Sequence, residues 1–252
     1  VTDGHNCVGT SSATIGQNDP IPPVAVCQNI TVQLNASGNL VVSAMEIDNG
    51  SSDNCGIASM VVTPNTFDCS HIGTNTVIMT VTDVNGNVST CTSTVTVEDD
   101  MPPTALCQDI VVQLDASGDA SITAAQIDNG SNDACGIASL SVSPSTFDCS
   151  NLGTNAVVLA VTDNSGNVST CNATVSVLDT ISPTAICQDL TIQLDANGDA
   201  VIVAADIDGG SFDNCDVASI MVNNSESESF DCGNVGANTV TLTVTDDNGN
   251  VS

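Results

Sequence analysis

The sequence of 252 residues contains no lysine and no arginine, against 30 aspartates and glutamates. Without a basic patch to neutralise phosphates, nucleic-acid binding and polybasic adhesion to anionic lipids are excluded. Schiff-base chemistry and phosphate clamping also lack their side chains, so we expect no enzyme. The net charge of −30 has to be balanced by solvent cations, bound metal ions or a basic partner.

Aromatic residues are also scarce, because the chain has no tryptophan, no tyrosine and only four phenylalanines. The cores must therefore be built from Val, Ile, Leu, Ala and Cys, and no aromatic platform is present to hold a sugar. No apolar run approaches the roughly 20 residues of a membrane span, so we expect no membrane insertion.

The chain is a set of repeats with a period of 80 residues. The segment from Val97 to Cys107 returns as Val177 to Cys187, and an earlier version ends at Cys27. Such self-similarity indicates tandem modules. We predict an Ig-like repeat 1 at 20–99, repeat 2 at 100–179 and repeat 3 at 180–252, the last without its final strand. Residues 1–19 are expected to be the terminal strand segment of a preceding or neighbouring-chain repeat.

Within each repeat, apolar and polar residues alternate with a period of two, as in 171–177 and 239–245. This alternation is typical of half-buried strands. Short strands separated by Asn-Gly and Asp-x-x-Gly turns predict an all-β fold made of Ig-like antiparallel β-sandwiches. For repeat 2 we expect the following strands: 105–114, 120–123, 136–143, 155–162 and 168–178.

Twelve cysteines recur at fixed positions, which indicates disulfide-stapled repeats in an oxidising, extracellular compartment. The first and last strands of a repeat begin near the same end, so Cys27–Cys91 and Cys107–Cys171 are plausible pairs. By elimination, the remaining pairs would be Cys55–Cys69, Cys135–Cys149 and Cys215–Cys232. Four cysteines allow three pairings, and the sequence leaves this choice open.

Cys7 and Cys187 remain without partners in this scheme. One interpretation is that the sequence is a window cut from a longer chain. The other is that the N-terminal segment of one chain supplies the missing last strand of repeat 3 in the next, with an intermolecular Cys7–Cys187 bond. Repeated head to tail, this exchange would make a filament.

Acidic turns are expected to gather where one repeat follows another. The first two strands should form a hairpin, which returns the loop at 128–133 to the joint at Asp99-Asp100. The turn at 163–167 precedes the last strand and belongs at the same end. Hard oxygen ligands without histidine favour Ca²⁺, although Asp and Asn are also common turn residues. The candidate ligands are Asp19, Asp48, Asp53, Asp83, Asn85, Asp99, Asp100, Asp128, Asp133, Asp163, Asp179, Asp208, Asp213, Asp246 and Asn248.

Three motifs resemble a known family. They are Pro-Pro-x-Ala-x-Cys at 102–107, Phe-Asp-Cys-x-x-x-Gly-x-Asn at 147–155, and Val-Thr-Asp-x-x-Gly-Asn-Val-Ser-Thr-Cys at 161–171. Together they are similar to the hyalin-repeat (HYR) Ig-like module, and more narrowly to repeats of large bacterial surface adhesins. The resemblance covers about 20–252, although the core tryptophan usual in that family is absent. It implies an extracellular spacer or adhesive module without enzymatic activity.

The sequence thus predicts a structural and adhesive cell-surface protein, forming a stiff rod or filament from copies of itself or from further repeats. The alternative is a ligand-binding module whose calcium-dependent acidic loops hold a sugar or a basic protein partner. A discrete binding site should make one repeat unlike the others, and the near-identity of the repeats favours the structural function.

Overall fold

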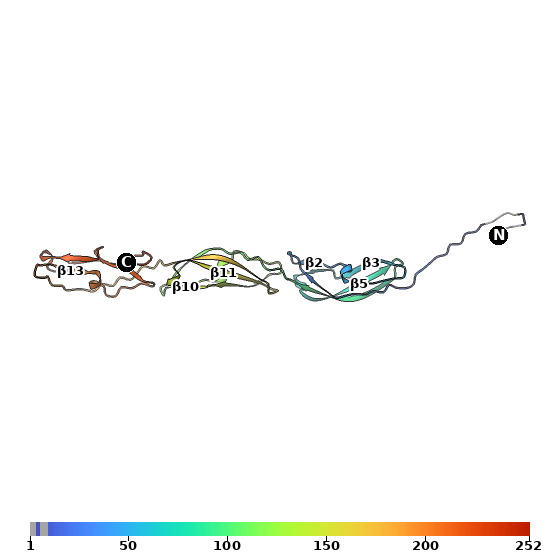
Figure 1. Cartoon of the computed structure of the whole chain (residues 1–252), viewed down its shortest axis with the longest axis horizontal. Coiled ribbons are helices and arrows are strands. Elements are labelled where there is room, and N and C mark those ends of the chain that lie inside the picture. Colours follow the sequence, from blue (N-terminus) through green and yellow to red (C-terminus); the bar gives the residue numbers. More distant parts are fainter. Residues whose placement is uncertain (1–3, 6–9) are drawn as a thin grey trace. The chain divides into compact units, whose positions relative to one another are not determined.

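The computed structural model describes residues 4, 5 and 10–252, and it divides into two compact units, Val1–Met101 and Pro102–Ser252. Cys7 lies outside the described residues. The second unit contains both repeat 2 and repeat 3. Figure 1 labels some of the elements of each unit.

The first unit is a two-layer β-sandwich. One sheet has the strand order β1-β6-β5-β3, and the other pairs β2 with β4. β1 runs parallel to β6, and the other pairs are antiparallel. The elements are β1 Ile30–Gln33, β2 Asn39–Val41, α1 Ala44–Ile47, β3 Ile57–Thr63, β4 Thr66–Asp68, η1 Cys69–His71, β5 Gly73–Asp83 and β6 Val88–Glu98.

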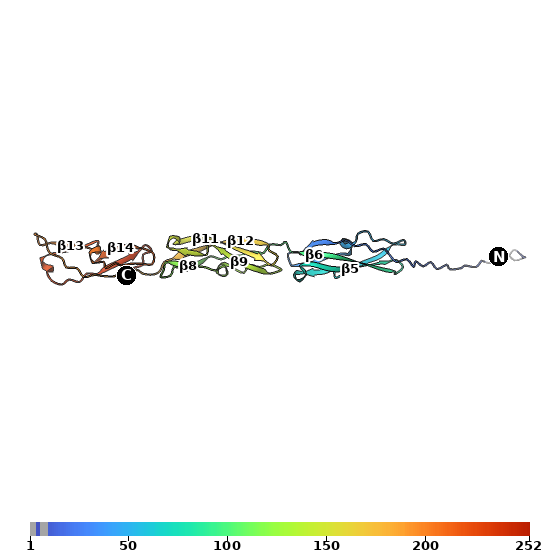
Figure 2. The ribbon, with the colours of Figure 1, turned by 90° about the horizontal axis from the view of Figure 1, so that it is seen from below.

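Repeat 2, in the second unit, has the same topology. Its sheets have the orders β7-β12-β11-β9 and β8-β10, and Figure 2 shows the long strands β11 and β12 side by side. The elements are β7 Ile110–Gln113, β8 Asp119–Ser121, α2 Ala124–Ile127, β9 Ile137–Ser143, β10 Thr146–Asp148, η2 Cys149–Asn151, β11 Gly153–Asp163 and β12 Val168–Leu178.

Repeat 3 keeps only part of this sandwich, with β13 paired to β15 and β14 paired to β16. The residues equivalent to β7 form no strand, because among the described residues there is no counterpart of β12 for them to pair with. A cavity of about 850 Å³, lined by Leu190, Ile192 and Phe230 among others, lies at this place. The elements are β13 Ala200–Val203, α3 Ala204–Ile207, β14 Val217–Val222, β15 Ser227–Phe230, η3 Cys232–Asn234 and β16 Leu242–Asp246.

The period-two pattern explains how each sandwich closes. In β11, Val157, Leu159 and Val161 are fully buried, whereas Val158 between them is 41% exposed. Strand residues alternate between the two faces of a sheet, so one face of β11 supplies the core. Phe147 from β10 is 4% exposed and packs into the same core from the opposite sheet. Aliphatic side chains and a single phenylalanine therefore fill the core of repeat 2.

The all-β, Ig-like sandwich was predicted correctly, and β12 has the expected bounds. The expected hairpin of the first two strands was wrong: β7 pairs with β12, and β8 pairs with β10 in the other sheet. The loop after α2 nevertheless returns to the start of the repeat, through the bridges Thr104–Asn132 and Cys107–Asp128. In the part of the chain that the structure describes, no helix could cross a membrane.

Candidate functional site

Two disulfides close the repeats in the way that the sequence made plausible. Cys27 is bonded to Cys91, and Cys107 is bonded to Cys171. Each bond ties the segment before the first strand of a repeat to the last strand of the same repeat. The predicted strand directions account for these pairs, since both cysteines of a pair lie near the same end of the sandwich.

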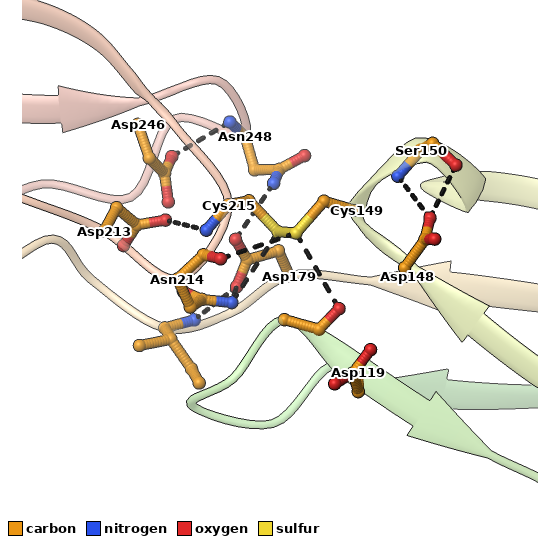
Figure 3. Close-up of a disulfide and its surroundings, with 12 residues drawn as sticks. Asp119, Asp148, Cys149, Ser150, Asp179, Asp213, Asn214, Cys215, Asp246 and Asn248 are labelled. Atoms are coloured by element: carbon orange, nitrogen blue, oxygen red, sulfur yellow. Dashed lines mark hydrogen bonds between the residues drawn. A yellow bond between two sulfur atoms is a disulfide. The ribbon is translucent and has the colours of Figure 1, made fainter.

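The other expected pairings were wrong. Cys149 is bonded to Cys215, which joins repeat 2 to repeat 3 (Figure 3), while Cys55 and Cys232 are free and exposed. This excludes Cys55–Cys69, Cys135–Cys149 and Cys215–Cys232, although Cys69 and Cys135 are each disulfide-bonded. The reason is distance. The seven residues of β9 separate Cys135 from Cys149 by roughly 20 Å, and a disulfide needs Cα atoms less than about 7 Å apart.

The turn before β8 lies against the Cys149–Cys215 bond. Asn214 Nδ2 donates to the carbonyl oxygen of Asp115 at 3.3 Å, and Cys149 Sγ lies 3.8 Å from the carbonyl oxygen of Gly118. Gly118 has φ of +79°, and a Cβ there would come within 2.8 Å of both Asn214 O and Cys149 Sγ. Glycine is therefore required where the two repeats meet. From the sequence, this segment was predicted only as a turn between strands. Its contact with the next repeat was missed, although the turn recurs in every repeat.

An acidic cluster lies beside the same bond. Asp179, Asp213 and Asp246 each bring one carboxylate oxygen to within 4.8 Å of the others (Figure 3). Asp179 and Asp246 are almost completely buried. The three residues come from the joint, the loop after α3 and the turn after β16, which are the three segments that the sequence predicted would converge.

One oxygen of this cluster makes no hydrogen bond. Asp213 Oδ2 accepts from the backbone N–H of Cys215 at 3.0 Å, but its Oδ1 is buried without a partner, as is Oδ1 of Asn214. Asn248 Nδ2 contacts Asp179 Oδ2 at 3.3 Å. Three carboxylates without a basic partner repel one another unless a cation lies between them. The oxygen donors and the unpartnered Asp213 Oδ1 fit a hard divalent cation such as Ca²⁺.

A similar cluster lies at the start of repeat 1. Asp19, Asp53 and Cys55 bring ligand atoms to within 4.8 Å of one another. Asp19 is 8% exposed, and its Oδ2, like Oδ1 of Asp53, is buried without a hydrogen bond of good geometry. The thiol of Cys55 lies close enough to Asp19 that this interaction, with smaller effects of burial and of nearby acids, raises the pKa of Cys55. The two carboxylates of this set fit a divalent cation.

Asp83, Asp163 and Asp246 organise the turns that precede the last strands. The carboxylate of Asp83 accepts the backbone N–H of Asn85 and Asn87 at 2.8 Å, and its other oxygen accepts Asn87 Nδ2 at 2.7 Å. Burial pushes the pKa of Asp83 up, but these hydrogen bonds outweigh it and leave the pKa below its usual value. Asp163 has the same turn bonds and the same direction of shift. These bonds position the buried acids.

Asp48, Asp128 and Asp208 bind their own loops. Each accepts from the backbone N–H of a serine three residues later, at 2.9 to 3.0 Å, and hydrogen bonds to that serine hold the pKa of each carboxyl below its usual value. This is the turn geometry that Asp adopts without any metal. The structure does not bring these three into the clusters around Asp19 and Asp179.

Three further candidate acids lie in the sequence near or after the boundary of the two units. Asp99 is 7% exposed and accepts from the backbone N–H of Met101 at 3.2 Å. Asp100 is exposed. Asp133 accepts from the backbone N–H of Cys135 at 2.7 Å. Of the last two cysteines, Cys187 is a free, exposed thiol, and Cys7 is not among the described residues.

Comparison with known proteins gives one curated relative. Hyalin from Strongylocentrotus purpuratus is 30% identical over 188 residues, which cover 71% of this chain and 16% of hyalin. The chain thus spans about one sixth of that relative. No protein-family profile matches the chain.

Among the solved structures that match the chain are extracellular cadherin domains and titin domains. Domains 1–4 of protocadherin gamma B7 are 12% identical and cover 92% of this chain and 74% of that chain, with a TM-score of 0.34. Titin domains I67–I69 are 9% identical and cover 92% of this chain and 95% of that chain, with a TM-score of 0.33. The sandwich itself and the sequence similarity to hyalin support an Ig-like repeat family for this chain.

Proposed function

We propose that the chain is part of an extracellular structural and adhesive protein that forms a stiff rod or filament on or outside a bacterial cell. One observation carries this proposal: the Cys149–Cys215 bond fastens repeat 2 covalently to repeat 3. A covalent bond between consecutive repeats limits their movement relative to each other and favours a mechanical role. Sequence similarity to hyalin supports the adhesive part. The resemblance of the sequence motifs to bacterial adhesin repeats is the basis for the cell type.

Calcium is the second component of the proposed joint. Asp179, Asp213 and Asp246 would hold one ion beside Cys215, and Asp19 and Asp53 would contribute to another at the start of repeat 1. A bound cation neutralises the mutual repulsion of the carboxylates. It also supplies a partner for Asp213 Oδ1, which is otherwise buried without one. In each repeat, the ion would connect loops that are far apart in sequence.

The proposed partners are copies of the chain or further repeats, arranged head to tail. The composition leaves no basic surface for nucleic acid, and no enzymatic activity is proposed. The intermolecular Cys7–Cys187 bond remains a prediction.

Electron microscopy of the purified chain, with and without reductant and calcium, tests the structural role. We expect rods with a constant spacing of modules, which bend more after reduction and after chelation. Collapsed particles of variable length under oxidising conditions with calcium would contradict a rod function.

A further inference from the structure

Cys55 occupies the same local structure as Cys215, which is bonded between repeats. In both places the backbone N–H of the cysteine donates to Oδ2 of an aspartate two residues earlier, at 2.8 Å for Cys55 and 3.0 Å for Cys215. In both places the preceding asparagine directs its Nδ2 at the sulfur, at 3.3 Å from Asn54 and 3.7 Å from Asn214. The loop at Cys55 is therefore shaped like one half of a joint between repeats.

Cys232 occupies the same local structure as the other half, Cys149. Each begins a short 3-10 helix capped by the preceding aspartate, Asp148 or Asp231. Each sulfur lies 3.8 Å from a glycine carbonyl oxygen, that of Gly118 or of Gly198.

The turn beside Cys232 matches the one at the existing joint. The turn that ends at Gly198 is closed by a hydrogen bond from Gly198 N–H to Asp195 O at 3.1 Å, as Gly118 N–H binds Asp115 O at 2.9 Å. Within its own repeat, the free thiol of Cys232 thus has the surroundings that Cys149 has in the disulfide.

The two halves differ from the existing joint in being uncovered. Cys55 and Cys232 are both free and exposed. A Cβ at Gly118 would meet Asn214 of the next repeat as well as a sulfur, whereas a Cβ at Gly198 would meet only the sulfur of Cys232, at 2.7 Å. The surface at Gly198 therefore lacks the covering loop that Gly118 has.

We propose that two copies of this chain join head to tail through a disulfide between Cys232 of one copy and Cys55 of the next, in the arrangement of the Cys149–Cys215 joint. Asn54 of the second copy would then donate to the carbonyl oxygen of Asp195 of the first, as Asn214 donates to Asp115. The inference rests on the proposed structural function and names the residues that connect the subunits.

The bond forms by exchange with a small-molecule or protein disulfide. The Cys232 thiolate attacks that disulfide, forms a mixed disulfide and releases one thiolate. The Cys55 thiolate of the second copy then attacks the sulfur of Cys232 and releases the other half. Two thiols lose two protons and two electrons, and the reagent disulfide is reduced to two thiols.

The test uses the full chain with Cys7→Ser and Cys187→Ser as the background, which leaves Cys55 and Cys232 as the free thiols of interest. One preparation carries Cys55→Ser, and the other carries Cys232→Ser and is labelled with ¹⁵N. The two are incubated with oxidised glutathione, separately and mixed, and the products are weighed by intact-mass spectrometry.

We expect the mixture to form a species of twice the 25.3 kDa chain mass that contains one labelled and one unlabelled copy, well above the half of all dimers that random pairing gives. Cleavage before aspartate should release peptide 53–67 bonded to peptide 231–245. Neither preparation alone should form this product, because each lacks one of the two cysteines. The background chain that keeps both thiols should form longer multimers, which reductant returns to monomer.

Dimers at the statistical share of one half, or a 55–232 bond found only at monomer mass, would overturn the head-to-tail joint. Circular dichroism and the Cys149–Cys215 peptide check that every variant is folded. Rods that respond to calcium but form no Cys232–Cys55 bond would contradict this inference alone and leave the proposed function standing.

Discussion

The disulfides Cys107–Cys171 and Cys149–Cys215 overlap in sequence, which gives repeats 2 and 3 an unusual response to force. When both repeats are unfolded but both bonds are intact, the shortest covalent path from Cys107 to Cys215 crosses the first bond, runs back 22 residues from Cys171 to Cys149, and crosses the second. With Cys149–Cys215 removed, the path contains 44 residues. With Cys107–Cys171 removed it contains 42, and with neither bond it contains 108.

These paths predict a strongly non-additive lengthening. A fully extended chain spans about 3.5 Å per residue, so removing either bond alone should add roughly 70–80 Å to the unfolded length, while removing both should add about 300 Å. The suitable sample is the unit Pro102–Ser252 with serine at Cys135, Cys187 and Cys232, pulled from its two ends in an optical trap. The variants are Cys149→Ser with Cys215→Ser, Cys107→Ser with Cys171→Ser, and all four together.

The comparison is internally controlled, because all variants share one sequence length and one pair of attachment points. Equal lengthening in one single-bond variant and in the variant without bonds would refute the interlocked arrangement, as would no lengthening on loss of Cys149–Cys215. Under force, each bond should halve the length of chain that the other bond leaves free to extend.

Three further predictions concern single residues. Leu159→Ala should lower the free energy of unfolding by about 2–5 kcal/mol in urea, whereas Val158→Ala on the outer face of the same strand should change it by less than about 0.5 kcal/mol. Asp213→Asn should leave the metal-free melting temperature unchanged or raised, because it relieves repulsion, but should remove most of the stabilisation by calcium; the exposed Asp216→Asn is the control. Because the folded-state pKa of Asp128 is lowered by Ser131, its contribution to stability is present above the unfolded-state pKa of about 3.9 and is lost as pH falls through the folded value. Ser131→Ala should therefore reduce the loss of stability between neutral and acidic pH, and an unchanged pH profile in urea unfolding would contradict this.

The sequence predicted the fold well where a pattern is local. Alternation gave β12 its bounds, because every second residue from Ala173 to Val177 faces the core. The first strand was predicted too long, since only Ile110–Gln113 has a partner in the sheet. The parallel pairing with β12 depends on which strands meet in space, and no local pattern encodes that.

The site was predicted in part for a similar reason. Strand direction correctly brought Asp179, Asp213 and Asp246 together, although the assumed hairpin was wrong. Cys149–Cys215 could not be derived, because its two cysteines belong to consecutive repeats and no pattern within one repeat brings them together. When all cysteines of a repeat are assigned partners within that repeat, a bond between repeats is missed.

Binding of calcium to the full chain, measured by titration calorimetry after exhaustive chelation, tests the proposed joint most directly. We expect binding that is weakened by Asp179→Asn and Asp213→Asn but not by Asp208→Asn. We also expect the unfolding free energy of each repeat that binds one calcium ion to rise by about 2.7 kcal/mol when free calcium is 100 times the dissociation constant. No heat of binding and an unchanged melting temperature would contradict a cation at the acidic clusters.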